Sequence, residues 1–332
     1  MIFFTIFIIF LALLFDFLNG MNDAANSIAT IVSTRVLTPR QAVLWAAFFN
    51  FAAAFGFGVN VATTVGKGIV ETNIVTHELI LAALVGAIVW THLCTRFGLP
   101  ISVSHALIGG LAGAGVVKAG FGALVAPGLI KVTIFIFLSP IIGFFLGIIF
   151  MISVTWIFRN WKIKKVDKVF KVGQLLSSAA FSLGHGTNDA QKTMGIIAIL
   201  LYSGGYLGSE FYVPLWVIIA SYSVIAAGTL TGGWKVIRTM GMRLTKLKPI
   251  GGFCAESGGA IVLLGTAAAG IPVSTTHTIA GAIMGVGSIK RLSAVRWGIA
   301  GKIVWAWVLT IPLSALCSAA VYELMRLIVG GQ

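Results

Sequence analysis

Long apolar runs limit this chain to one broad class of structure. They cover residues 1–18, 42–65, 79–94, 129–158, 214–232 and 297–329, some with a break or a proline inside. Only 10% of the residues are charged, whereas soluble domains carry about 25%. One globular core cannot hide so much apolar surface, but roughly 20 consecutive apolar residues suffice to cross a bilayer as a helix. We therefore expect an all-α integral membrane protein, with the lipid bilayer as its surroundings.

The formal net charge of +14 agrees with a membrane protein. Basic residues gather in the short gaps 159–171, 235–248 and 290–296, which the positive-inside rule places in the cytoplasm. No platform of basic and aromatic residues indicates a nucleic-acid partner. The first basic residue is Arg35, which predicts that the amino terminus lies outside the cell and that Met1 begins the first span.

Two pairs of matching motifs indicate a duplicated sequence. The segment GMNDA at residues 20–24 returns as GTNDA at 186–190, offset by 166 residues. The segment GLPISVSH at 98–105 returns as GIPVSTTH at 270–277, offset by 172. The same order at nearly the same offset predicts two related halves.

The charged gaps predict that the two halves are inverted. We place the first half at 1–158 and the second at 172–332, joined by a basic cytoplasmic linker at 159–171. The gap after the first NDA segment carries two arginines, whereas its counterpart at 202–212 carries no basic residue. In the next pair of gaps, the basic bias lies in the second half. Equivalent gaps therefore face opposite sides of the membrane, as in the inverted repeats of many secondary transporters.

Each copy of the first motif places an aspartate inside an apolar stretch, where ionisable residues are costly and mark functional sites. A glycine and an asparagine precede each aspartate, and we expect the helix to break at both places. Carboxylates, amides and freed carbonyls are hard oxygen ligands that suit sodium, although each aspartate could instead cap a helix. The predicted sodium ligands are Asn22, Asp23, Asn26, Asn188 and Asp189.

Each copy of the second motif predicts a helix start that is rich in hydroxyls. The apolar run behind it has about 10 residues, too short to span alone, which favours a re-entrant hairpin. Two helix N-termini that face each other at mid-membrane would cradle an anion, although they could also be ordinary N-caps. The histidines could contact the anion, carry a proton or orient the loop. The predicted anion-binding residues are Ser102, Ser104, His105, Gln191, Thr193, Ser274, Thr275, Thr276 and His277.

Three further ionisable residues stand in or beside apolar stretches. We expect Lys192 to pair with a nearby carboxylate or with the substrate, and Glu256 must also find a partner. We assign both residues to coupling or gating. Asp16 lies on α-helical spacing from Asp23, and its role stays open.

At these residues the sequence resembles the PiT family of inorganic phosphate transporters. That family carries a GxND-A-N-S motif and a G-[LI]-P-[IV]-S-x-[ST]-H motif in each half. They stand here at 20–27, 186–193, 98–105 and 270–277. The likeness covers essentially the whole chain and keeps the motif order. It implies phosphate uptake coupled to sodium or protons, and a homo-oligomer, with a dimer favoured.

Two departures from the family pattern bear on coupling and size. Many animal members have a glutamate early in the second span, where this chain has Asn50, whereas the glutamate before the second Gly-x-Pro motif is retained as Glu256. The long cytoplasmic domain of animal members is reduced to the linker.

We therefore predict a secondary active transporter that symports inorganic phosphate with sodium by alternating access. Sodium would be a co-transported ligand, and no organic cofactor is expected. A proton-coupled phosphate or sulfate permease and an anion channel are the alternatives. An enzyme is not expected, because the sequence has no HExxH motif, no recognised nucleophile–base signature and no nucleotide-binding signature.

Overall fold

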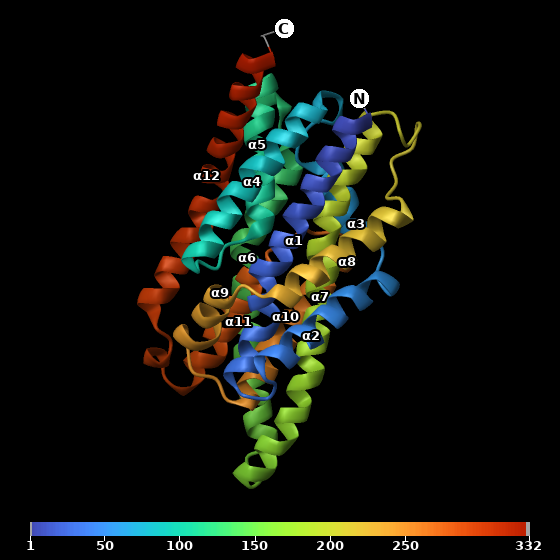
Figure 1. Cartoon of the computed structure of the whole chain (residues 1–332). Coiled ribbons are helices and arrows are strands. Elements are labelled where there is room, and N and C mark those ends of the chain that lie inside the picture. Colours follow the sequence, from blue (N-terminus) through green and yellow to red (C-terminus); the bar gives the residue numbers. More distant parts are fainter. Residues whose placement is uncertain (1, 330–332) are drawn as a thin grey trace.

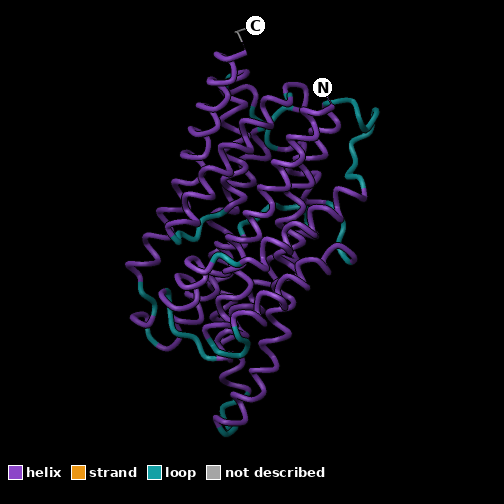
Figure 2. The backbone as a smooth tube through the Cα atoms, viewed as in Figure 1, coloured by secondary structure: helices purple, strands orange, loops and turns teal. Residues whose placement is uncertain are grey.

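The computed structural model describes residues 2–329, and within them it contains helices and no β-strand element. Loops and turns join the helices, and the connection at residues 204–214 is a long one (Figure 2). The α-helices of the first half are α1 (Ile2–Ser33), α2 (Pro39–Ala52), α3 (Asn60–Gly68), α4 (His77–Phe97), α5 (Val103–Ala119) and α6 (Ala126–Ile157). Those of the second half are α7 (Ile163–Ser203), α8 (Leu215–Thr231), α9 (Trp234–Arg238), α10 (Pro249–Ala268), α11 (Thr275–Lys290) and α12 (Trp297–Val329).

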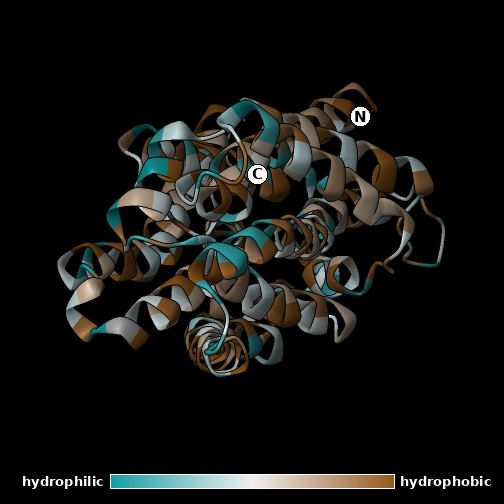
Figure 3. Ribbon diagram, turned by 90° about the horizontal axis from the view of Figure 1, so that it is seen from below, coloured by the Kyte–Doolittle hydropathy of each residue, from teal (hydrophilic) through white to brown (hydrophobic). Residues whose placement is uncertain are grey.

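The helices have the length and apolar surface of a membrane domain. Within the described residues, five are long and apolar enough to span, namely α1, α4, α6, α10 and α12, and two bent pairs pass the same test. Large apolar side chains are exposed, such as Phe3 at 85% and Trp305 at 67%. Apolar residues occur on helices around the outline of the molecule (Figure 3). The protein is therefore an all-α integral membrane protein.

The predicted helix breaks at the two NDA segments are wrong. Both α1 and α7 continue as helix through their motifs. The backbone does not need to open, because the polar side chains find partners on other helices. The glycines before the motifs serve close packing instead, since a Cβ on Gly20 would lie 2.2 Å from Ile225 O.

The breaks lie in the neighbouring bent pairs. The 83° bend separates α2 and the 3-10 turn η1 (Ala53–Phe55) from α3, and the 64° bend separates α8 from α9 and the π-helical turn η4 (Thr239–Arg243). These bends interrupt the apolar run 42–65 and follow the run 214–232, each of which the sequence presents as a span.

The linker is shorter than the sequence predicts. Residues 163–171 form the first turns of α7, so that only residues 158–162 connect α6 to α7. Charged side chains do not end the helix here because this end of α7 is exposed on most faces.

Each half ends in a helical hairpin and a long helix, and the halves interlock through these elements. The second helices of the hairpins, α5 and α11, have 17 and 16 residues, more than the predicted run of ten. On α12, Ser318 Oγ donates to Gly110 O of α5 at 2.8 Å. On the other side, His277 Nδ1 of α11 lies 3.3 Å from Ile136 O of α6. The last helix of each half therefore packs on the hairpin of the other half.

The two motif-bearing helices run in opposite directions (Figure 1). Thr5 near the start of α1 lies 3.4 Å, hydroxyl to hydroxyl, from Tyr206 just after the end of α7. At the other end, Thr34 Oγ1 donates to Gln174 Oε1 at 2.8 Å. This antiparallel crossing brings the two NDA motifs to the same level at the centre of the molecule.

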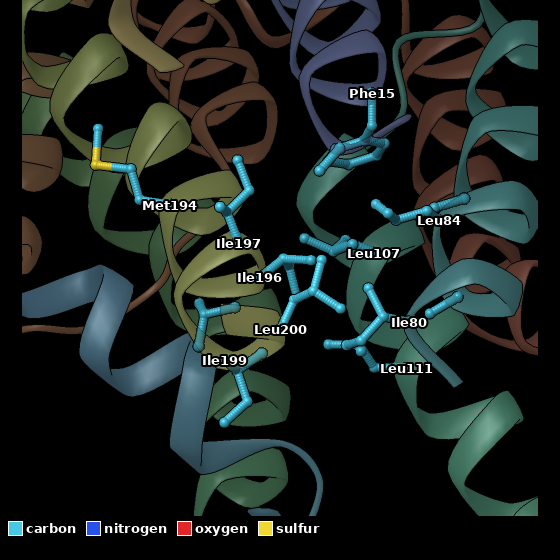
Figure 4. Packing of buried hydrophobic residues seen from close by; sticks show 14 of the residues in the cluster. Phe15, Ile80, Leu84, Leu107, Leu111, Met194, Ile196, Ile197, Ile199 and Leu200 are labelled. Carbon is cyan, nitrogen blue, oxygen red and sulfur yellow. The ribbon is translucent and has the colours of Figure 1, made fainter. Parts of the chain in front are cut away.

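Apolar side chains fill the space beside this crossing. Figure 4 shows Phe15 of α1, Leu84 of α4, Leu107 of α5 and Leu200 of α7 within one buried cluster. Burial of such side chains is worth about 1.5–3 kcal/mol each. This cluster holds α1 and α7 against the first hairpin.

Candidate substrate and ion site

Asp23 and Asp189 meet where α1 crosses α7. Both are buried, and one hydroxyl joins them: Thr275 Oγ1, at the first residue of α11, lies 3.2 Å from Asp23 Oδ2 and 3.0 Å from Asp189 Oδ2. Ligand atoms of Asp23, Asp189 and His185 all lie within 4.8 Å of one another, close enough to hold one cation together. The two repeated motifs thus form one polar centre rather than two.

Amides of the first half leave buried oxygens beside this centre. Asn26 Nδ2 donates to Thr276 Oγ1 at 2.9 Å and to Thr275 Oγ1 at 3.1 Å. Asn22 Nδ2 donates to Thr95 Oγ1 at 2.6 Å. Among residues 2–329, Oδ1 of Asn22 and Oδ1 of Asn26 have no hydrogen-bond partner. Buried oxygens of this kind usually have a partner, and they are the ligand type that a hard cation takes.

The corresponding atoms of the second half are occupied. Asn188 Oδ1 accepts from Val273 N at 3.3 Å, and its Nδ2 donates to Leu263 O at 3.0 Å. Lys192 Nζ lies 2.6 Å from Asp189 Oδ1, 2.5 Å from Ser104 Oγ and 2.7 Å from Val273 O. The expectation that Lys192 pairs with a carboxylate is confirmed by this buried ion pair.

The hairpin turns bring the N-termini of α5 and α11 face to face. The rings of His105 and His277 lie 4.8 Å apart, centroid to centroid, at an interplanar angle of 71°. Ser102 and Ser274 are N-caps, and each accepts a hydrogen bond of 3.2 Å from the backbone of its own histidine. These two serines therefore have the ordinary capping role that the sequence left as an alternative. The hydroxyls beyond them, on Ser104, Thr275 and Thr276, contact the polar centre directly.

Gln191 has a different set of partners from the predicted anion-binding hydroxyls. Its Oε1 accepts from Val61 N at 2.9 Å and from Ala62 N at 3.3 Å, and its Nε2 donates to Gly58 O at 2.6 Å. These contacts satisfy the first amides of α3, just after the bend. The structure thus places Gln191 as a support of the bent pair.

Thr193 lies beside Asp16 of α1, on the side of the centre toward the start of α1. Both residues are buried. The side chains of Thr193 and Asn19 lie around the Asp16 carboxylate. Asp16, whose role the sequence left open, is therefore a further buried carboxylate near the site, in addition to Asp23 and Asp189.

His185 belongs to the site, although the sequence reasoning missed it. Its Nε2 lies 3.2 Å from Asp189 Oδ2, and its Nδ1 lies 3.0 Å from Asn50 Oδ1. Asn50 Nδ2 in turn donates to Thr229 Oγ1 at 2.9 Å. The signal was present in the repeat, because His185 precedes its motif at the position equivalent to the polar Asn19.

Glu256 is held by three hydrogen bonds toward the far end of α1. It accepts from Thr30 Oγ1 at 2.5 Å, from Gln174 Nε2 at 2.9 Å and from Ser177 Oγ at 2.5 Å. Buried carboxylates need such donors. The equivalent position of the first half is Leu84, in the apolar cluster, so that the two halves differ in polarity at this position.

Comparison with known proteins agrees with this arrangement. A model of the phosphate transporter family matches residues 19–166 and 158–318. A probable low-affinity inorganic phosphate transporter of Rhizobium meliloti (strain 1021) is 59% identical, over 95% of this chain and 94% of that protein. One of the same description from Bacillus subtilis (strain 168) is 43% identical, over 98% of each chain.

A solved structure shares the fold of the whole chain. It is described as the sodium-dependent phosphate transporter and superposes with a TM-score of 0.87 at 28% identity, covering 98% of this chain and 99% of that one. The motifs, the two family matches and the fold lead to the same assignment. This chain belongs to the phosphate transporter family, and it is a membrane transporter and not an enzyme.

Proposed function

We propose that this protein carries inorganic phosphate across the cell membrane together with sodium, by alternating access. The observation that carries the proposal is the meeting of Asp23 and Asp189 at the Thr275 hydroxyl, with buried Asn22 and Asn26 oxygens beside them. A carboxylate with several neutral oxygens is a ligand set for a hard cation. The solved relative described as sodium-dependent supports sodium as that cation.

Phosphate would bind between the hairpin tips. The N-termini of α5 and α11 supply backbone amides and positive dipole ends, and Ser104 and Thr276 supply hydroxyls. His105 and His277 stand beside these hydroxyls as further donors. Neutral donors suit an anion that must also leave the site.

Charge balance makes the coupling obligatory in this proposal. Two carboxylates and the Lys192 ammonium give the centre a net charge of −1, which repels an anion at close range. Sodium bound at Asp23 removes that repulsion, so that phosphate binds after the cation. Glu256, with its own hydrogen-bond network, would take part in coupling or in gating on the side toward the end of α1.

The wider arrangement is part of the proposal. The halves would sit in the membrane with inverted topology, the amino terminus outside and the basic loops in the cytoplasm. Antiparallel α1 and α7 support this orientation. The homodimer implied by the family resemblance stays a prediction, which a mass measurement in detergent would test.

Phosphate uptake into proteoliposomes tests the coupling ion. We expect uptake to require an inward sodium gradient at fixed pH and to fall to background when potassium or choline replaces sodium. Full uptake without sodium that collapses on adding a protonophore would instead establish proton coupling, and would direct attention to His105, His277 and Glu256. Phosphate uptake that depends on neither the sodium gradient nor the proton gradient would favour the anion channel.

A further inference from the structure

We propose that the ammonium group of Lys192 replaces one co-transported cation. Under this proposal, which rests on the proposed function, the Asp189 position carries its own tethered positive charge. Only the Asp23 position would then take a sodium ion from solution. The inference concerns the number of cations moved with each phosphate.

The two halves provide an internal comparison. Lys192 occupies the position that Asn26 occupies in the first half, at the same offset of 166 residues as the two aspartates. Their contacts also correspond: Asn26 Nδ2 donates to Thr276 Oγ1 of the second hairpin, and Lys192 Nζ donates to Ser104 Oγ of the first hairpin. Ser104 and Thr276 are themselves equivalent residues. One half has an amide and the other an ammonium at the same place.

The surroundings of Lys192 Nζ resemble those of a bound cation. An ammonium has three hydrogens to donate, and three oxygens lie within 2.7 Å of Nζ, from Asp189, Ser104 and Val273. The exposed fraction of Lys192 is 2%. A carboxylate, a hydroxyl and a backbone carbonyl form an oxygen set that a sodium ion could also use.

The first half shows the opposite pattern. Within the described residues, Asp23 forms no salt bridge, and it accepts hydrogen bonds from the hydroxyls of Thr275 and Thr276. The buried oxygens Asn22 Oδ1 and Asn26 Oδ1 have no partner there either. The equivalent Asn188 Oδ1 is bound to Val273 N. The cation ligands are thus available in one half and already used in the other.

Replacement of the lysine by the residue of the other half tests the proposal. In Lys192→Asn, the second half regains the amide of the first half, and Asp189 needs an external cation. We expect the Hill coefficient for sodium in phosphate uptake to rise by about one, and the sodium-to-phosphate ratio from dual-isotope uptake to rise equally. The melting temperature of this variant should also increase more with sodium concentration than that of the unmodified protein does.

Two matched variants separate charge from structure. Lys171→Asn removes the same charge from an exposed position of α7, where Lys171 only pairs with Asp167 at 3.3 Å, and it should leave the sodium dependence unchanged. Lys192→Arg keeps the charge and should keep the original Hill coefficient. The reciprocal change, Asn26→Lys, gives the first half its own tethered cation and should abolish stabilisation by sodium.

The outcomes distinguish this inference from the proposed function. If the unmodified protein needs no sodium, the proposed function fails, but Lys192→Asn should still acquire a sodium requirement. An unchanged Hill coefficient in an active Lys192→Asn protein would overturn the inference. The inference would also be overturned if Lys192→Asn lowered the melting temperature and added sodium did not restore it. Lys192 would then have a structural role only. If Lys192→Asn cannot be purified, Asn26→Lys decides, and retained sodium stabilisation would refute the inference.

Discussion

At the scale of single residues, the two aspartates share a motif but have different neighbours. Asp189 is paired with the buried Lys192, whereas Asp23 meets hydroxyls. Removing one partner of a buried ion pair costs about 3–5 kcal/mol. We therefore expect Asp189→Asn to be strongly destabilised in detergent and Asp23→Asn to stay folded but lose sodium-dependent uptake. Thermal melting and uptake of both variants check this, and equal stability losses would contradict the assigned asymmetry.

The Thr275 hydroxyl gives a second residue-scale prediction. It lies between the two carboxylates, whereas the equivalent residue of the first half is Val103. Thr275→Val should lower the melting temperature of the protein in sodium-free buffer, because hydrogen bonds to charged groups are worth about 1.5–3 kcal/mol. Thr278→Val is the control, since its hydroxyl only donates to Ser274 O at 2.9 Å. Melting temperatures that fall equally for both variants would remove the special role of Thr275.

How much of the site could be predicted depended on what each residue contacts. Repetition identified Asp23 and Asp189, because an aspartate in the same motif at equivalent positions of both halves indicates a common function. Repetition did not reveal that Gln191 supports α3, because no sequence pattern links Gln191 to the bend at Gly58. His185 was missed because it differs in type from its counterpart Asn19.

At the scale of elements, the glycines before the NDA segments act through packing. A glycine close to an asparagine inside an apolar run indicated broken helices, but composition alone does not say whether a glycine opens the backbone or lets a neighbouring helix approach closely. A Cβ on Gly186 would lie 2.5 Å from Asn50 O, and one on Gly20 would lie 2.2 Å from Ile225 O. The breaks themselves fall in the bent pairs that these glycines contact.

Alanine substitutions test this packing role. Gly20→Ala and Gly186→Ala should each lower the melting temperature, because overpacking typically costs about 1–3 kcal/mol. Gly265→Ala in α10 is the control, since a Cβ there meets no atom within 4 Å. It should be neutral or stabilising, as alanine is the better helix former by about 0.5–1 kcal/mol. If Gly20→Ala and Gly186→Ala both had normal melting temperatures, the helices packed at these glycines could move apart without a loss of stability.

At the scale of the whole molecule, the sequence predicted more of the fold than of the site. Apolar runs and repeated motifs were enough for a helical membrane protein in two halves. The interlocking of α6 with α11 and of α12 with α5 was not predictable, because it depends on which helix faces meet after both halves have folded. This exchange places each hairpin tip against residues of both halves, as Ser104 with Lys192 and Thr276 with Asn26 show.

Inverted topology gives the last prediction. α1 has 32 residues, or about 48 Å at 1.5 Å per residue, which exceeds the roughly 30 Å of a bilayer core. The loop after α1 and the loop after antiparallel α7 should therefore face opposite sides. Cysteines at Arg40 and Glu210, both exposed, should label from opposite sides in intact cells, with Arg40→Cys reached only after permeabilisation. Ser293→Cys, in the basic loop before α12, should behave like Arg40→Cys. Labelling of Arg40→Cys and Glu210→Cys from one side would contradict the inverted arrangement of the two halves.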